Sequence, residues 1–197
     1  HWPSIALIAC VAPIYLSALP TGITSRNRGE DGAELVAAAV TGGTAHPPGY
    51  PLYLIVIRLT CALFSSRDPI DVAHAASAVF ALVAGCAWTK IVRSTLDRHV
   101  DVQPMLRDVS AFVAGAVLCF SPTLFGQALI AEVYAFHAAL IGLYLVLAMG
   151  MIRAPEIRPW RAFALGLVAS LAIGHHLTAV PVVAAAMLAL VLARVPR

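Results

Sequence analysis

Long apolar stretches recur along nearly the whole chain and constrain its fold more than any other feature. They lie at 3–20, 50–65, 69–89, 109–131, 133–152, 162–173 and 177–193. Hydrophobic residues make up 60% of the 197 residues and charged residues only 12%, whereas a soluble domain has about 25% charged residues. Because a helix needs about 20 apolar residues to cross a bilayer, the sequence predicts an all-α, polytopic membrane bundle with about six spans.

The charge balance excludes one class of partner. Thirteen basic and ten acidic residues give a net charge of +3, which is too small for a protein that binds nucleic acid through its phosphates. We expect the lipid bilayer to surround most of the chain. The sequence predicts a single module, with a first span at 1–20, a long loop at 21–68 and five further spans within 69–197.

The positions of Lys and Arg predict which connections face the cytoplasm. Most basic residues fall in three places along the chain: Lys90, Arg93, Arg98, Arg107, then Arg153, Arg158, Arg161, and finally Arg194 and Arg197. By the positive-inside rule these three places are cytoplasmic. A pair of predicted spans separates each of these places from the next, so the chain returns to the same side of the membrane each time.

Which side of the membrane the long loop faces depends on whether the segment 50–65 crosses the bilayer. This segment is only about sixteen residues long, shorter than a usual span, and it carries Pro51 at its start. Arg58 lies in its middle, where a charge costs roughly 2.5–3.5 kcal/mol in a membrane helix. We therefore expect 50–65 to lie along the interface and 21–49 to be external. We also expect a multi-pass protein of a bacterial inner membrane.

An acidic cluster lies in the middle of the predicted external loop. Glu30, Asp31 and Glu34 are close in sequence, and carboxylates three or four residues apart share one face of a helix. A carboxylate at a dry membrane surface can act as a general base. The spacing of Asp31 and Glu34 also fits a capping box that starts a short helix over 35–40. The two interpretations are compatible.

The block HPPGYPLY at 46–53 combines three prolines with a glycine. Proline fixes φ and removes an amide donor, so we expect a rigid, non-helical turn that holds His46 and Tyr50 in fixed directions. The alternative is an ordinary junction between a loop and a helix, with Pro51 near the first helical position.

Two further polar sites interrupt the apolar stretches. Glu132 follows Pro122 and Gly126, which predict a break between two helices; an ionisable residue there indicates a functional site, or a helix-end carboxylate that reaches water. His175 and His176 would point about 100° apart on a helix, so they suit an anionic headgroup better than a metal ion. We assign no metal ligands and no cofactor. Three single histidines are expected to be structural: His74, His99 and His137.

In their order and spacing these motifs resemble the GT-C superfamily of integral-membrane glycosyltransferases. The most similar branch is protein O-mannosyltransferase-like, found in bacteria and typified in animals by the transmembrane protein 260 family. The resemblance covers nearly the whole chain. HPPGYPLY is its most specific element, accompanied by EDGAE at 30–34, EVY at 132–134 and GHH at 174–176.

The resemblance implies transfer of a sugar from a polyprenyl-phosphate donor to an acceptor at the external face. The first-loop acid of this family type, which acts as catalytic base or positions the acceptor, maps onto Asp31, with Glu34 in support, and the second external acid onto Glu132. The superfamily also places an interfacial helix in its first external loop. The substrate-binding candidates are His46, Tyr50, Arg58, His175 and His176. The last three are candidates to stabilise the negative charge of the leaving phosphate.

The chain also departs from the family pattern. Members of the family are typically longer, often with a soluble acceptor-binding domain, and six spans fall short of a seven-helix module. A second hypothesis is therefore a truncated, non-catalytic subunit that packs against other integral-membrane subunits through Ala- and Gly-rich helix faces. A small transporter fits less well, because no predicted span holds an ionisable pair at its midplane.

Overall fold

The computed structural model describes residues 2–98 and 102–194, and the regular structure in these residues is entirely helical. The elements are α1 (Trp2–Ala18), η1 (Arg26–Arg28), α2 (Gly32–Thr41), α3 (Pro51–Leu63), α4 (Pro69–Leu96), α5 (Pro104–Cys119), α6 (Pro122–Ala128), α7 (Val133–Arg153), α8 (Pro159–His175) and α9 (Ala179–Leu192). The predicted all-α class is confirmed. His99 and Arg197, named above, lie outside the described residues.

Several helices have the length and composition of membrane spans. α4 and α7 are long and apolar enough to cross a membrane, and the bent pair of α5 and α6 would form a third span. The helices α1, α2, α3 and α9 are apolar but only 10–17 residues long. The protein is therefore a helical membrane protein, and its division into about six spans stays a prediction.

The apolar stretch 109–131, which the sequence predicted as one span, is bent in the structure. α5 ends at Cys119, α6 begins at Pro122, and the two helices meet at 67°. Proline cannot donate the hydrogen bond that would continue the preceding helix, and Ser121 Oγ accepts the N–H of Leu124 to start a new one. A second break between α6 and α7 confirms that the chain leaves helical geometry just before Glu132.

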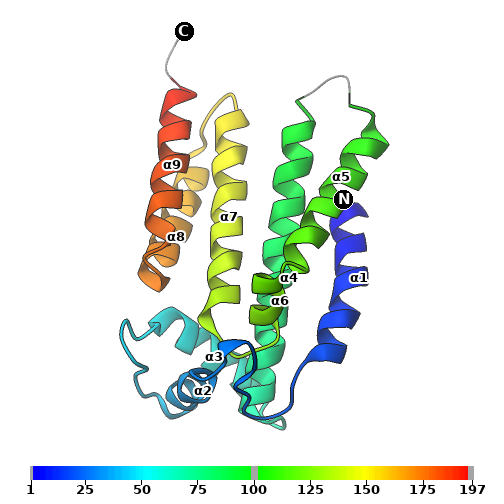
Figure 1. The fold of residues 1–197 in the computed structure, drawn as a ribbon. Coiled ribbons are helices and arrows are strands. Elements are labelled where there is room, and N and C mark those ends of the chain that lie inside the picture. Colours follow the sequence, from blue (N-terminus) through cyan, green and yellow to red (C-terminus); the bar gives the residue numbers. More distant parts are fainter. Residues whose placement is uncertain (1, 99–101, 195–197) are drawn as a thin grey trace.

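The helices form a bundle with one elaborated end. α1, α4, α5, α7, α8 and α9 run along the bundle, whereas η1, α2 and α3 gather at one end of it (Figure 1). We call this the acid end, made of η1, α2, α3 and residues 129–132. The opposite, basic end comprises the C-terminal ends of α4 and α7 and the N-terminal end of α8. α3 does not run along the bundle, and its interfacial position stays a prediction.

Close packing fixes the frame on which the acid end rests. A Cβ at Gly85 of α4 would collide with the Cys119 sulfur of α5, and a Cβ at Gly115 would collide with Thr89 Oγ1. Small residues of this kind let membrane helices approach closely. Tyr15 of α1 is fully buried and its hydroxyl donates to the carbonyl of Cys119 at 2.8 Å. α1, α4 and α5 therefore form one tightly packed unit.

Candidate functional site

Glu34 joins the proline-rich turn to α2. One carboxylate oxygen accepts the backbone N–H of His46 at 2.6 Å, and the other lies 3.1 Å from His46 Nδ1. Asp31 Oδ2 lies 3.8 Å from Nε2 of the same ring. The hydrogen bonds from His46 lower the pKa of the Glu34 carboxyl below its usual range. We call Asp31, Glu34 and His46 the acid-imidazole cluster.

This cluster shows that the capping-box interpretation is wrong. α2 covers the predicted short helix, and Asp31 stands at its N-cap, but the Asp31 side chain makes no capping hydrogen bond. Glu34 reaches forward to His46. The carboxylate of Glu34 finds stronger donors in the turn than the N-cap amide of its own helix would provide, because one imidazole and one amide converge on it.

The acid-imidazole cluster also has the donor set of a metal site. One possible ligand atom from each of Asp31, Glu34 and His46 lies within 4.8 Å of the other two. Carboxylate oxygen and imidazole nitrogen are ligands for zinc and related ions. The sequence interpretation assigned no metal ligands, and it missed this set because Glu34 and His46 are 12 positions apart on different elements. Direct hydrogen bonds between Glu34 and His46 also satisfy these two groups without an ion.

Tyr50 connects the acid-imidazole cluster to the interior. The block HPPG forms the expected non-helical turn, and Pro51 is the first residue of α3. Tyr50 has a left-handed φ of 43° and is buried. Its ring centroid lies 5.6 Å from that of His46 and 5.9 Å from that of His175. Burial raises the pKa of the Tyr50 hydroxyl, so this side chain stays neutral.

Glu132 lies inside the protein, immediately before α7. It is 3% exposed, its Oε2 accepts the N–H of Val133 at 3.3 Å, and its Oε1 has no partner among the described residues. Burial raises the pKa of the Glu132 carboxyl to about 7, and the negative charge of Asp31 adds to the effect. The alternative of a helix-end carboxylate that reaches water is therefore wrong, since the long loop covers this segment.

Two glycines allow the loop to cover Glu132. A Cβ at Gly32 would lie 2.9 Å from the carbonyl oxygen of Ala131, and one at Gly29 would lie 3.4 Å from the Ile130 side chain. The start of α2 is thus in direct contact with the segment that precedes α7. This contact brings Asp31 and Glu132, which are far apart in sequence, to the same part of the acid end.

The adjacent histidines have different surroundings. His175 is fully buried, and its Nε2–H donates to the carbonyl of Val133 at 3.1 Å. His176 is half-buried, with Nδ1 2.8 Å from Thr178 Oγ1, and the same hydroxyl lies 3.0 Å from His137 Nε2. His137, which we expected to be structural, therefore belongs to this polar group. A lone histidine on an apolar helix gave no spacing signal that could have indicated it.

Arg58 lies apart from the other predicted site residues. It is exposed on α3 near the C-terminal end of α2, where a Cβ at Gly42 would lie 2.7 Å from its Nη1. A hollow of about 440 Å³ at this place is lined by Arg58, Thr44, Pro48 and Gly49, among others. Most of the other predicted site residues come together. Asp31 and Glu34 lie beside His46, and Tyr50 lies between His46 and His175. The contact between Gly32 and Ala131 brings Glu132 to the same end.

The fold and this site define a polytopic helical membrane protein whose carboxylates and histidines gather at one end of the bundle. The family described as "Protein O-mannosyl-transferase TMEM260 N-terminal domain" matches residues 31–196, and the chain belongs to this family. The mouse protein named "Protein O-mannosyl-transferase TMEM260" is 28% identical over 146 residues, which cover 74% of this chain and 19% of the mouse protein. The chain thus spans about a fifth of that relative's length. No solved structure matches it. The family resemblance of the sequence motifs is confirmed.

Proposed function

We propose that the chain forms the catalytic part of a glycosyltransferase that moves a sugar from a polyprenyl-phosphate donor to an acceptor hydroxyl. The observation that carries this proposal is the convergence of an exposed carboxylate, Asp31, and a buried one, Glu132, at the acid end. The name of the mouse relative supports mannose as the sugar and a protein as the acceptor. The proposal puts the acid end outside a bacterial inner membrane, because the basic loops lie at the other end.

Asp31 is the proposed general base. Its carboxylate is open to solvent and lies 3.8 Å from His46 Nε2, a distance at which a protonated imidazole would attract it. An acceptor hydroxyl bound to Asp31 would attack the anomeric carbon of the sugar. The bond from that carbon to the phosphate oxygen breaks, the phosphate leaves with the electron pair, and Asp31 takes the hydroxyl proton. Glu34 supports this step because it fixes His46.

Glu132 has the properties of the second acid. With a pKa of about 7 it exchanges its proton near neutral pH, and its free Oε1 can donate or accept a hydrogen bond. A substrate hydroxyl at the acid end would satisfy this buried oxygen. The unpaired Oε1 and the raised pKa of Glu132 thus support a role in orienting the acceptor beside Asp31.

The leaving phosphate needs positive charge more than it needs a proton. Arg58 is the best of the three predicted candidates. His175 is buried and already hydrogen-bonded to a backbone carbonyl, and His176 Nδ1 is within hydrogen-bond distance of Thr178 Oγ1. The hollow that Arg58 lines shares Pro48 and Gly49 with the turn that carries His46. Its apolar wall, which includes Ile55, offers contacts to a polyprenyl chain.

Substitution of Asp31 tests this function. Membranes that contain the protein would be supplied with radiolabelled mannosyl polyprenyl phosphate and assayed for sugar on protein acceptors. We expect Asp31→Asn to abolish transfer while its thermal unfolding in detergent matches that of the wild type. Glu30→Gln, an exposed neighbour, serves as the control and should keep its activity. Full transfer by Asp31→Asn would show that Asp31 is not the base, and absence of transfer by the wild-type protein with every polyprenyl-phosphate sugar would refute the function.

A further inference from the structure

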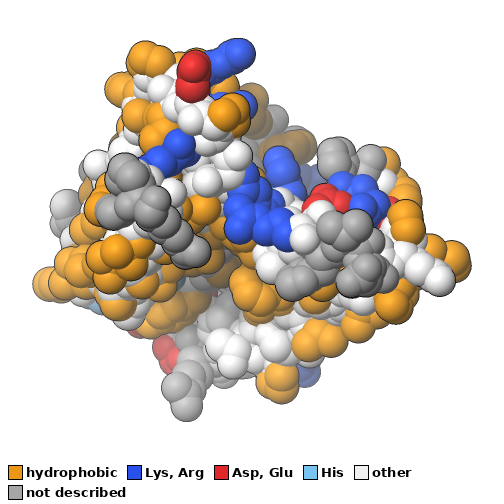
Figure 2. Space-filling view, turned by 90° about the horizontal axis from the view of Figure 1, so that it is seen from above, with side chains coloured by type: hydrophobic (Ala, Val, Ile, Leu, Met, Phe, Trp, Pro, Cys, Tyr) orange, Lys and Arg blue, Asp and Glu red, His pale blue; other side chains and the backbone are white. Residues whose placement is uncertain are grey.

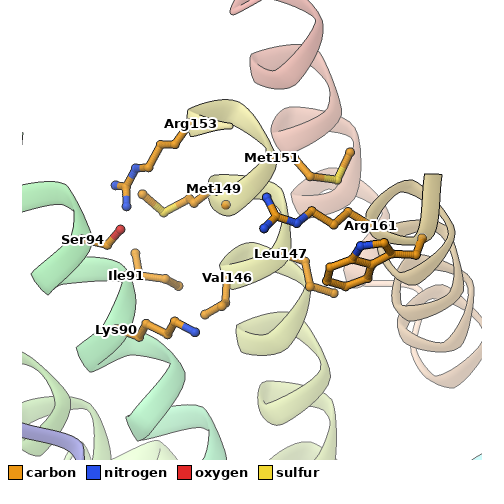
Figure 3. Close-up of a pocket in the computed structure, with 11 residues that line it drawn as sticks. Lys90, Ile91, Ser94, Val146, Leu147, Met149, Met151, Arg153 and Arg161 are labelled. Atoms are coloured by element: carbon orange, nitrogen blue, oxygen red, sulfur yellow. The ribbon is translucent and has the colours of Figure 1, made fainter. Parts of the chain in front are cut away.

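A second hollow lies at the basic end of the bundle, away from the proposed active site. It measures about 360 Å³ and lies between α4, α7 and α8. Figure 3 shows Lys90, Arg153 and Arg161 reaching into it, one from each of these helices. Viewed from above, Lys and Arg side chains gather on this face (Figure 2). The rest of the lining is largely apolar and includes Trp160 and Val146.

The three cations of this hollow have no ion pair among the described residues, in contrast to Arg93 and Arg107 at the same end. Arg93 Nε lies 2.7 Å from Asp108 Oδ1, and Arg107 pairs with both Asp97 and Asp108. No acidic residue lines the hollow itself. Like charges held together repel one another, so an anion between them would be bound favourably.

An apolar crevice continues from the same place. It measures about 810 Å³, lies between α1, α4 and α7, and shares Lys90, Ser94 and Val146 with the basic hollow. Most of its other lining is apolar and includes Ile8, Val79, Leu82, Val83 and Leu143. Arg93 and Asp97, which belong to the ion-paired group described above, also line it. A cationic hollow that opens into an apolar crevice matches a ligand with an anionic head and a hydrocarbon chain.

We propose that the basic end binds a lipid whose phosphate head has a net negative charge, with the phosphate among Lys90, Arg153 and Arg161 and an acyl chain in the crevice. Guanidinium groups bind phosphate oxygens through paired, charge-assisted hydrogen bonds. Basic pockets between membrane helices on the cytoplasmic side bind lipid phosphates in this way, and Trp160 suits the depth of the headgroups. This site is independent of the proposed sugar transfer.

The test compares lipids and matched variants of the full chain, purified in a neutral detergent. Binding would be measured for phosphatidic acid, phosphatidylcholine, diacylglycerol and glycerol 3-phosphate. We expect phosphatidic acid to bind at least about tenfold more tightly than the other three. The double variant R153Q/R161Q should lose at least about tenfold in that affinity. R98Q/R158Q removes the same charge from exposed positions at the same end, outside the hollow, and should keep it.

Each other outcome would overturn the proposal. Equal loss in both double variants would mean that general surface charge attracts the lipid. Equal affinity for glycerol 3-phosphate would assign the hollow to a free phosphate, and equal affinity for diacylglycerol would exclude recognition of the phosphate. The exposed Lys90→Gln provides a second, milder variant if R153Q/R161Q unfolds, and undiminished binding of phosphatidic acid by Lys90→Gln would also count against the site.

Discussion

Glu132 is the residue whose surroundings least suit its chemical type. A carboxylate that is 3% exposed, with one oxygen unpaired among the described residues, is costly to ionise. Its pKa is accordingly raised to about 7 from an ordinary value of 4.5. Groups with such shifts concentrate at functional sites, although buried structural carboxylates show them too.

The raised pKa of Glu132 predicts a pH dependence of stability. Between pH 4.5 and pH 7 the folded protein holds a proton that the unfolded chain has lost, so the free energy of unfolding falls as the pH rises through this window. Glu132→Gln stays neutral and lacks this fall. As the pH rises from 4.5 to 8, we expect the free energy of unfolding of the variant to increase by up to about 3 kcal/mol relative to that of the wild type. Thermal unfolding in detergent at a series of pH values measures this difference.

The control for this prediction is Glu30→Gln, which changes an exposed carboxylate of the same loop. Its unfolding curve should follow the wild type at every pH. If the unfolding free energies of Glu132→Gln and the wild type changed with pH in parallel, water would reach the Glu132 carboxylate and its pKa would not be raised. The proposed role of Glu132 as the second acid would then lose its support.

At this scale the sequence predicted residue types better than contacts. Asp31, Glu34 and His46 were identifiable because acids and imidazoles are rare in so apolar a chain. The sequence did not show whether Glu34 caps α2 or binds His46, because that depends on where the proline turn folds back. His137 was missed because only the approach of α8 to α7 brings a partner to it.

Among the elements, the contact between α2 and the segment before α7 assembles the acid end. Gly32→Ala places a Cβ against the Ala131 carbonyl, a backbone atom that cannot move by a rotamer change. We expect this substitution to lower the free energy of unfolding by about 1–3 kcal/mol. Sugar transfer should fall as well, because Asp31 moves away from Glu132. Thermal unfolding and the transfer assay measure the two effects.

Gly166→Ala is the matched control for this change. Gly166 lies inside α8, and a Cβ there would meet no atom within 4 Å. In a helix interior alanine is preferred over glycine by about 0.5–1 kcal/mol, so Gly166→Ala should be as stable as the wild type or slightly more so. Equal behaviour of the two alanine variants would mean that the loop does not pack on residue 131.

The link between α2 and the proline turn gives a further prediction. Glu34→Ala removes the acceptor of the His46 backbone N–H and the partner of the His46 ring. We expect amide hydrogen exchange over residues 44–50 to become severalfold faster, with little change in global unfolding, because the pair is exposed. Glu30→Ala should leave this exchange unchanged. Unchanged exchange in Glu34→Ala would indicate that the prolines alone hold the turn.

The elements themselves followed from the sequence to a large extent. The apolar stretches located most helices, and the proline-rich block correctly predicted the start of α3. The bend after Cys119 did not follow from hydropathy, because the residues on both sides of it are equally apolar. Pro122 indicated a break, but not that α6 would turn by 67°.

For the whole molecule, the separation of charge between the two ends relates the fold to the membrane. The acid end carries the acid-imidazole cluster, and the basic end carries Lys90, Arg153 and Arg161. The helices between them present apolar surfaces, with large exposed side chains such as Phe163, Leu188 and Val191. Exposed apolar side chains are expected where lipid is the solvent. The two proposed sites therefore require opposite faces of one bilayer.

This arrangement predicts which positions a membrane-impermeant thiol reagent reaches in intact cells, once the four native cysteines, Cys10, Cys61, Cys86 and Cys119, are replaced by alanine. Thr44 and Ser66 are exposed on either side of α3, and Glu156 is exposed between α7 and α8. If α3 lies along the interface, Thr44→Cys and Ser66→Cys both react from outside, whereas Glu156→Cys reacts only after the membrane is opened, since its end carries the basic loops. Reaction of Thr44→Cys and Ser66→Cys from opposite sides would mean that α3 crosses the bilayer. The acid-imidazole cluster would then face the cytoplasm, where an external acceptor cannot reach Asp31.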